Sequence, residues 1–151
     1  NSDNIAEISI TGAELSVQYN ILKSLNLNMS YSYNYSVVSD FDVSDINSSV
    51  DLSGLYLSEV SPLLIYAGAS WKNKLFHLNL NCNYTEEQFW DVENTVVVED
   101  YFVANMKLSK TFKKRYHFYI DIQNILDNQF VDRKGRLSPG RFIIGGFKFI
   151  L

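Results

Sequence analysis

The chain has 151 residues, of which 46% are apolar and 20% are charged, a length and balance typical of one globular domain. Its net charge of -4 excludes a strongly basic nucleic-acid-binding surface, so no nucleic-acid partner is expected. Ten Tyr and ten Phe accompany only two Pro and one Cys, a composition that favours strands and excludes an internal disulfide.

No stretch approaches the roughly 18 uninterrupted apolar residues of a membrane-spanning helix, and no cleavable signal sequence opens the chain. The sequence begins with Asn1 and not with Met. We therefore expect a fragment or a processed piece of a longer protein.

Strict alternation of apolar and polar residues is the main local signal. The stretch LNLNMSYSYNYSV, residues 25–37, predicts a strand with one apolar face and one face of Asn and Ser. Similar alternation recurs about seven times; the predicted strands lie near residues 5–21, 25–37, 63–71, 76–84, 102–109, 116–123 and 143–151. In the first of them the apolar parity changes at Gly12-Ala13, where we predict a β-bulge.

The connections alternate between short turns and long loops. The turns fall near residues 22–24, 72–74 and 113–115, and the loops near 38–61, 85–100 and 124–139. The first two loops are acidic and contain no Lys or Arg. Because charges concentrate in the connections and the polar strand faces hold mostly Asn, Ser, His and Tyr, the pattern favours a transmembrane antiparallel sheet. Aromatic residues near strand ends are then expected in girdles at the two membrane interfaces: Tyr31, Tyr33, Tyr35, Trp71 and Tyr116.

The last third of the chain, FYIDIQNILDNQFVDRKGRLSPGRFIIGGFKFIL, closely resembles the carboxyl end of TonB-dependent outer-membrane receptors. The family's N-L-F-D element is matched by residues 124–127, with Asn124, Leu126 and Asp127. Its P-G-R element is matched by Pro139, Gly140 and Arg141. The final strand carries Phe149, and Leu151 stands where the family normally has Phe. Upstream, ISITGAEL and DYFVANMKLSKTF are similar to two further strands of the family.

This resemblance implies an all-β fold: about seven up-and-down strands from the wall of a barrel of about 22 strands, with long extracellular loops and short periplasmic turns. Single-chain bacterial barrels have even strand numbers, and open sheet edges are costly in hydrocarbon. Residues 1–151 are therefore expected to be the C-terminal portion of a receptor barrel, without the plug domain and the N-terminal strands.

The resemblance also implies a location in the bacterial outer membrane and the import of a scarce nutrient, such as a siderophore, a corrinoid or an oligosaccharide, with TonB-coupled energy. The implied partners are outer-membrane lipid, the remaining strands and plug, the TonB system through the missing part, and a small nutrient. Two alternatives stay open: part of a passive pore or adhesin, and a soluble β-sandwich or lipocalin-like binding module. No nucleophile with an oxyanion element accompanies His117, Tyr119 and Asp121, so we expect no enzyme and no cofactor.

The acidic loops supply the candidates for ligand contact. Phe89 and Trp90 are the expected aromatic platform, and the acidic candidates are Glu86, Glu87, Asp91, Asp40 and Asp42. Acidic residues also simply keep loops solvated, and that alternative stays open. The stretch FDVSDINSSVD lacks the spacing of a calcium loop. His77 and His117 fall on polar faces about 10 Å apart, by twice the interstrand spacing, so no metal site is predicted.

Overall fold

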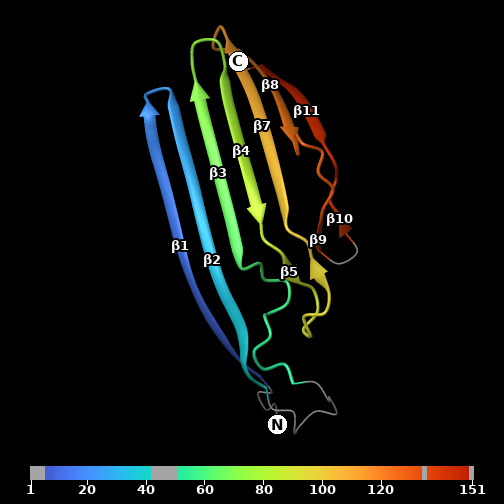
Figure 1. Ribbon diagram of the computed structural model, residues 1–151. Helices are drawn as coiled ribbons and strands as arrows, with labels where there is room; N and C mark the ends of the chain where they lie inside the picture. The colour runs from blue at the N-terminus through green and yellow to red at the C-terminus, as the bar shows by residue number, and fades with distance from the viewer. Residues whose placement is uncertain (1–5, 42–50, 134–135, 150–151) are drawn as a thin grey trace.

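The computed structural model describes residues 6–41, 51–133 and 136–149. One antiparallel sheet of seven strands dominates, in the order β1-β2-β3-β4-β7-β8-β11 (Figure 1). Its strands are β1 (Ala6–Leu22), β2 (Leu25–Phe41), β3 (Leu63–Lys72), β4 (His77–Thr85), β7 (Tyr101–Phe112), β8 (Tyr116–Gln123) and β11 (Phe142–Phe149). The described part of the chain has no helix suited to crossing a bilayer. The predicted all-β, seven-stranded antiparallel arrangement is confirmed.

Short turns lie together at one end of the sheet and the long connections at the other (Figure 1). The long connections contain two small ribbons that the sequence did not predict. In one, β5 (Gln88–Phe89) pairs with β6 (Val97–Val98); in the other, β9 (Val131–Arg133) pairs with β10 (Arg136–Leu137). Both are too short to show recognisable alternation.

The strand register joins the apolar residues of all seven strands into one continuous face. Directly paired residues point to the same side of a sheet. One such row runs through Leu27, Ala69, Leu80, Met106, Ile122 and Ile143. A parallel row on the opposite side runs through Asn28, Gly68, Asn81 and Asn105. We call the first side the outward face and the second the inward face.

Burial in the sheet is the reverse of that in a soluble domain. Along residues 26–35 of β2 each polar side chain is half-buried, while each apolar one is exposed, as at Tyr33 with 42% of its surface accessible. Among the described residues the buried apolar side chains are Val37, Val38 and Val98, and no large side chain is fully buried. A soluble domain of this length would bury a sizeable apolar core. Within the described residues, therefore, no protein covers the apolar face of the sheet.

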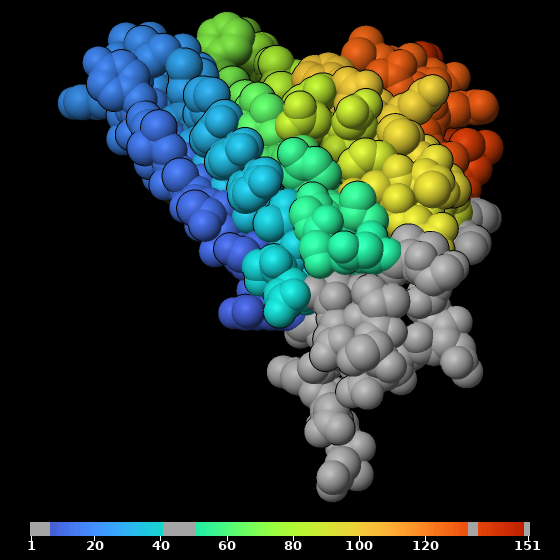
Figure 2. All heavy atoms as spheres, turned by 60° about the horizontal axis from the view of Figure 1, so that its bottom comes forward, coloured from blue at the N-terminus to red at the C-terminus, as the bar shows by residue number. Residues whose placement is uncertain are grey.

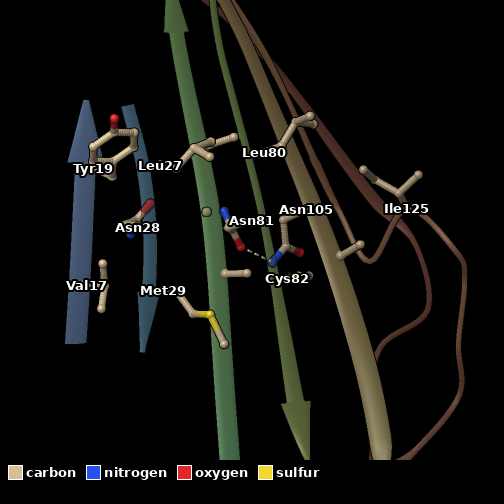
Figure 3. Close-up of a pocket in the computed structure, with 14 residues that line it drawn as sticks. Val17, Tyr19, Leu27, Asn28, Met29, Leu80, Asn81, Cys82, Asn105 and Ile125 are labelled. Atoms are coloured by element: carbon tan, nitrogen blue, oxygen red, sulfur yellow. Dashed lines mark hydrogen bonds between the residues drawn. The ribbon is translucent and has the colours of Figure 1, made fainter. Parts of the chain in front are cut away.

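The outward face is divided into zones along the strands. Tyr31, Tyr33, Tyr84 and Phe102 lie toward the long-loop end, and Trp71, Tyr116, Phe118 and Phe147 toward the short-turn end. The zone between them is aliphatic or small, and Ala67, Cys82 and Ala104 pair directly across three strands. Their small side chains leave an apolar hollow of about 640 Å³, bordered by Leu27, Met29 and Leu80 (Figure 3). This hollow is an open depression on the outward face of the sheet.

The predicted bulge at Gly12-Ala13 is wrong. The β1–β2 register runs unbroken through both residues, and its shifts lie instead between Glu7 and Ile8 and between Asn20 and Leu22. Ile8 and Ile10 consequently share a face with Val38 and Ser36 on the inward side. β2 also continues to Phe41, past the predicted end, because residues 54–57 of the first long loop hydrogen-bond along its other edge. The ends of β1 and β2 thus project past the pairing of β2 with β3, which ends at Tyr33, and there the outward side need not be apolar.

The inward face is held by hydrogen bonds between neutral side chains and by one ion pair. The Asn105 amide donates to Asn81 at 2.8 Å (Figure 3), and Lys107 Nζ lies 3.7 Å from Asp121. His77 and His117 bond to Ser70 and Thr111 respectively. Within the described residues no cluster of ligands suits a metal ion.

Candidate functional site

The second long loop projects a small hairpin whose tip is closed by one carboxylate. Asp91 accepts hydrogen bonds from the backbone N–H groups of Thr95 and Val96 and from the Thr95 hydroxyl, the last at 2.6 Å. The Thr95 hydroxyl contributes most to lowering the pKa of Asp91 to about 2. Two residues before this tip, β5 pairs with β6 and fixes Phe89 opposite Val97. Asp91 thus shapes the hairpin that presents the aromatic candidates.

The first long loop is fastened to this hairpin. Asn94 accepts a hydrogen bond from the Tyr56 backbone N–H at 2.7 Å and donates to its carbonyl at 2.9 Å. The Glu59 N–H donates to the Phe89 carbonyl at 2.7 Å. The Tyr56 ring stacks on Phe89 with 6.1 Å between centroids and meets Tyr35 edge-on at 5.7 Å. Figure 2, with the long-loop end brought forward, shows the two loops as one cluster.

A hollow of about 240 Å³ lies between these loops. Its lining includes Tyr56, Pro62, Glu86, Glu87 and Phe89. Three of the predicted contact residues, two carboxylates and an aromatic ring, therefore meet at one place. Such a mixture of aromatic surface and a few charged groups is typical of small-molecule sites.

A second, larger hollow of about 500 Å³ lies between the second and third long loops. Trp90, Glu99 and Asp100 line one side, and Asn128 and Phe130 the other. The rings of Tyr101 and Phe130 stack nearly parallel, with 4.1 Å between centroids, and hold the loops together. Among the described residues, the lining includes two carboxylates, Glu99 and Asp100, and no Lys or Arg. We call the two hollows and the loops around them the loop cluster.

The structure brings together most of the predicted contact residues. Phe89, Glu86 and Glu87 line the smaller hollow and Trp90 the larger. Asp91 lies at the hairpin tip, with its carboxylate engaged by the turn. Asp40 lies near the end of β2, opposite Glu7, and the described linings of these hollows do not include it. Asp42 falls outside the described residues.

Sequence reasoning missed Tyr56, Tyr101 and Phe130, which the structure places at the joints between loops. Tyr56 lies between Leu55 and Leu57 in an acidic loop, and this short apolar stretch was the available signal. Tyr101 and Phe130 carried no comparable signal, because their contact joins residues far apart in the chain.

The two motifs in the last third of the chain form one joint. Asn124, only 5% exposed and at φ 51°, donates its side-chain amide to Asn128 O at 2.8 Å. Asp127 accepts the Arg141 backbone N–H at 2.6 Å, and its carboxylate occupies the space beside Gly140 where a Cβ would lie. The motif requires Asn at a left-handed position and Gly at a close approach.

The remaining motif residues frame this joint. Pro139 O lies 3.5 Å from the Asn124 amide, and Leu126 is exposed beside it. Phe149 pairs with Tyr116 on the outward face. Leu151 lies outside the described residues.

The family model described as TonB dependent receptor-like, beta-barrel, matches residues 1–125. This chain belongs to that family of TonB-dependent receptors. The family consists of receptors and transporters of the Gram-negative outer membrane, so the chain is part of an outer-membrane receptor wall. The outward face therefore borders lipid, and the soluble binding module is excluded. No curated protein matched the sequence.

Solved structures of TonB-dependent receptors share the fold. The siderophore receptor PiuA from Acinetobacter baumannii superimposes with a TM-score of 0.86 at 19% identity, over 97% of this chain and 22% of PiuA. The ferric citrate transporter FecA, in its unliganded form, gives a TM-score of 0.78 at 15% identity, over 95% of this chain and 24% of FecA. BauA, the ferric preacinetobactin receptor from A. baumannii, gives a TM-score of 0.78 at 16% identity, over 95% of this chain and 22% of BauA. The chain thus spans less than a quarter of these receptors.

Proposed function

We propose that this chain is the C-terminal wall of a receptor that binds a scarce nutrient outside the cell and imports it with energy from the TonB system. The observation that carries the proposal is the lipid-facing wall whose long loops join into one cluster with two hollows. The family membership supports the same conclusion. A binding surface held by hydrogen bonds and ring stacking suits recognition, and a passive pore requires no such cluster.

The rest of the receptor lies outside these residues. Both β1 and β11 have a single neighbour in the described sheet. In hydrocarbon each unpaired backbone group costs several kcal/mol. Further strands must pair with both edges, and we propose that the plug domain and the TonB-coupling segment lie with those strands.

An iron–siderophore complex is the nutrient we favour. PiuA is a siderophore receptor, and BauA takes ferric preacinetobactin. The loop cluster supports a ligand that suits an aromatic and acidic surface, because Phe89, Glu86 and Glu87 line the smaller hollow and Trp90 and Asp100 line the larger one. Like charges repel across such a surface. A neutral or cationic complex is therefore favoured over a strongly anionic one, and a corrinoid or a neutral oligosaccharide is the second candidate.

The test is nutrient binding and uptake by the complete receptor carrying Trp90→Ala or Phe89→Ala. Either change should weaken binding of the transported complex by about 10-fold or more, since a buried aromatic contact contributes roughly 1–3 kcal/mol. The matched control is Phe112→Ala, which removes an exposed ring at the opposite end of the sheet. Unchanged affinity in both loop variants would remove the loop cluster from the binding site.

A further inference from the structure

Basic residues gather at the short-turn end of the sheet. The turn segments 22–25, 72–77 and 110–116 contain no Asp or Glu. They lie side by side at one end in Figure 1. We call the following set the basic rim: Lys23, Lys72, Lys74, Lys110, Lys113, Lys114 and Arg115. All are exposed except Lys110, which is half-buried. With no carboxylate among these turns, the rim carries an uncompensated positive potential.

Lys110 fixes the depth of the rim relative to lipid. It pairs with Phe118 on the outward face, and on β3, β4, β7, β8 and β11, as far as they are described, it is the one charged residue of that face. Its Nζ donates to the Lys74 carbonyl at 2.7 Å. The aliphatic stem thus lies along the apolar surface while the ammonium reaches the turn, as lysines do at the edge of the hydrocarbon.

The turns themselves are amphipathic. Leu75 lies at the tip of the β3–β4 turn with 72% of its surface exposed, directly after Lys74. Trp71 and Phe76 meet edge-on beside it at 5.3 Å. Apolar and aromatic residues beside lysines suit the layer where acyl chains meet headgroups. A surface that met only water or a soluble acidic protein would not need Leu75 there.

The β7–β8 turn keeps two lysines where its backbone favours other residues. Lys113 and Lys114 adopt φ of 50° and 57°, and the Arg115 N–H bonds to the Phe112 carbonyl. The connection between β7 and β8 has three residues, 113–115, and positive φ at its first two positions favours Gly, Asn or Asp over lysine. Lysine at both positions retains charge at the expense of backbone conformation.

We propose that the basic rim binds the phosphates of anionic phospholipids in the periplasmic leaflet of the outer membrane. The short turns of such barrels face the periplasm. Lys110 and the turn lysines then lie at phosphate depth, and Leu75 enters the acyl region below. The proposal rests on the family membership and is independent of which nutrient the receptor imports. Its partner is a lipid headgroup with net negative charge.

The experiment uses the complete receptor, reconstituted with its native flanking sequence in bilayers of phosphatidylcholine and phosphatidylglycerol. Trp71, on the outward face beside the rim, reports which lipid lies next to it when one of the two lipids is brominated. The contribution of Trp71 is the part of the fluorescence quenching that disappears in the Trp71→Phe variant. Because each cation near an anionic surface contributes about 1 kcal/mol, we expect phosphatidylglycerol to be preferred by roughly fivefold or more. Added salt should reduce the preference.

Substitution of Lys110, Lys113, Lys114 and Arg115 by Gln should bring the preference close to one. Two variants that each remove one positive charge test whether its position matters. Arg115→Gln should lower the preference for phosphatidylglycerol. Arg136 is an exposed arginine at the long-loop end, and Arg136→Gln should leave the preference unchanged. Equal quenching by both lipids in the unaltered receptor would overturn the proposal. An acidic periplasmic protein would then be the favoured partner of the basic rim. Should the fourfold variant fail to fold, the salt dependence and the single variants still decide, and none of these readouts requires nutrient uptake.

Discussion

Gly145 and Gly146 are adjacent in β11 and face opposite sides of the sheet. A Cβ added at Gly146 would enter the Tyr119 ring, whereas one at Gly145 would have its nearest neighbour, the Tyr119 carbonyl oxygen, at 4.0 Å. The same Tyr119 ring lies 5.2 Å from Lys107 Nζ, which also pairs with Asp121. Gly146 therefore makes room for a ring that joins β8 to β7 on the inward face.

We predict that Gly146→Ala destabilises the complete receptor by about 1–3 kcal/mol, since overpacking forces the ring out of place. Gly145→Ala is the control and should change the free energy of unfolding little, because its methyl group enters lipid. Urea unfolding in detergent micelles measures both. In a Tyr119→Ala background the Gly146→Ala penalty should disappear; a penalty that persisted there would refute the explanation.

At the loop tip, Asp91 makes the hairpin sensitive to acid. Its pKa is lowered from 3.8 to about 2, chiefly by the Thr95 hydroxyl. A depressed pKa in the folded state means that the carboxylate stabilises the tip above about pH 4. The stabilisation is lost as the pH falls toward 2. Hydrogen exchange of residues 91–96 in the complete receptor should therefore quicken over that interval.

The variant Thr95→Val removes the strongest of these bonds. It should return the pKa of Asp91 toward its ordinary value and move the onset of fast exchange to higher pH. If the unaltered hairpin loosened at the same pH as the Thr95→Val variant, the Thr95 bond would not be the cause.

At the scale of elements, neighbouring residues of one strand face two different solvents. Met29 lies on the outward face in the aliphatic zone, and Asn28 lies on the inward face opposite Gly68. We predict that Met29→Arg costs about 2–4 kcal/mol, as charged residues do near the bilayer midplane. Asn28→Arg should be tolerated, because its side chain extends into the wet interior. Reversible unfolding in lipid vesicles would show the difference, and equal costs at the two positions would contradict the assignment of faces.

The sequence predicted the strands and their faces well, because an alternation of period two survives even where lipid replaces a protein core. The predicted bulge at Gly12-Ala13 failed because Ile8 and Ile10, whose parity suggested it, lie beyond the pairing of β2 with β3, where the outward side need not be apolar. The sequence predicted Phe89 and Trp90 as loop aromatics and missed Tyr56, whose role depends on a contact with Phe89. Long-range loop packing leaves no periodic signal in a single chain.

At the scale of the whole molecule, charge and polarity divide the wall along two directions. Across the sheet, lipid-facing apolar residues oppose neutral amides and hydroxyls. Along the strands, the two acidic loops, residues 38–61 and 85–100, lie at the end opposite the basic rim. The resemblance in the last third of the chain predicted the family, and the structure adds what its motif residues do. Asn124 bonds to Asn128 within the third loop, and Asp127 bonds to Arg141, directly before β11.

The unequal lengths of the strands have a consequence for what can adjoin β1. Pairing of β2 with β3 ends at Tyr33 and Leu63, while pairing with β1 continues to Phe41. The paired ends of β1 and β2 therefore project about eight residues, or roughly 25 Å, beyond the shorter strands. Water can solvate the unpaired edge of β1 in this projecting part, so a strand that pairs with that edge in the complete receptor needs to match only the rest of β1. The length of that neighbouring strand can vary without exposing unpaired backbone to lipid hydrocarbon. The projecting ends of β1 and β2 also offer a site for inserting an epitope tag that reaches the cell surface.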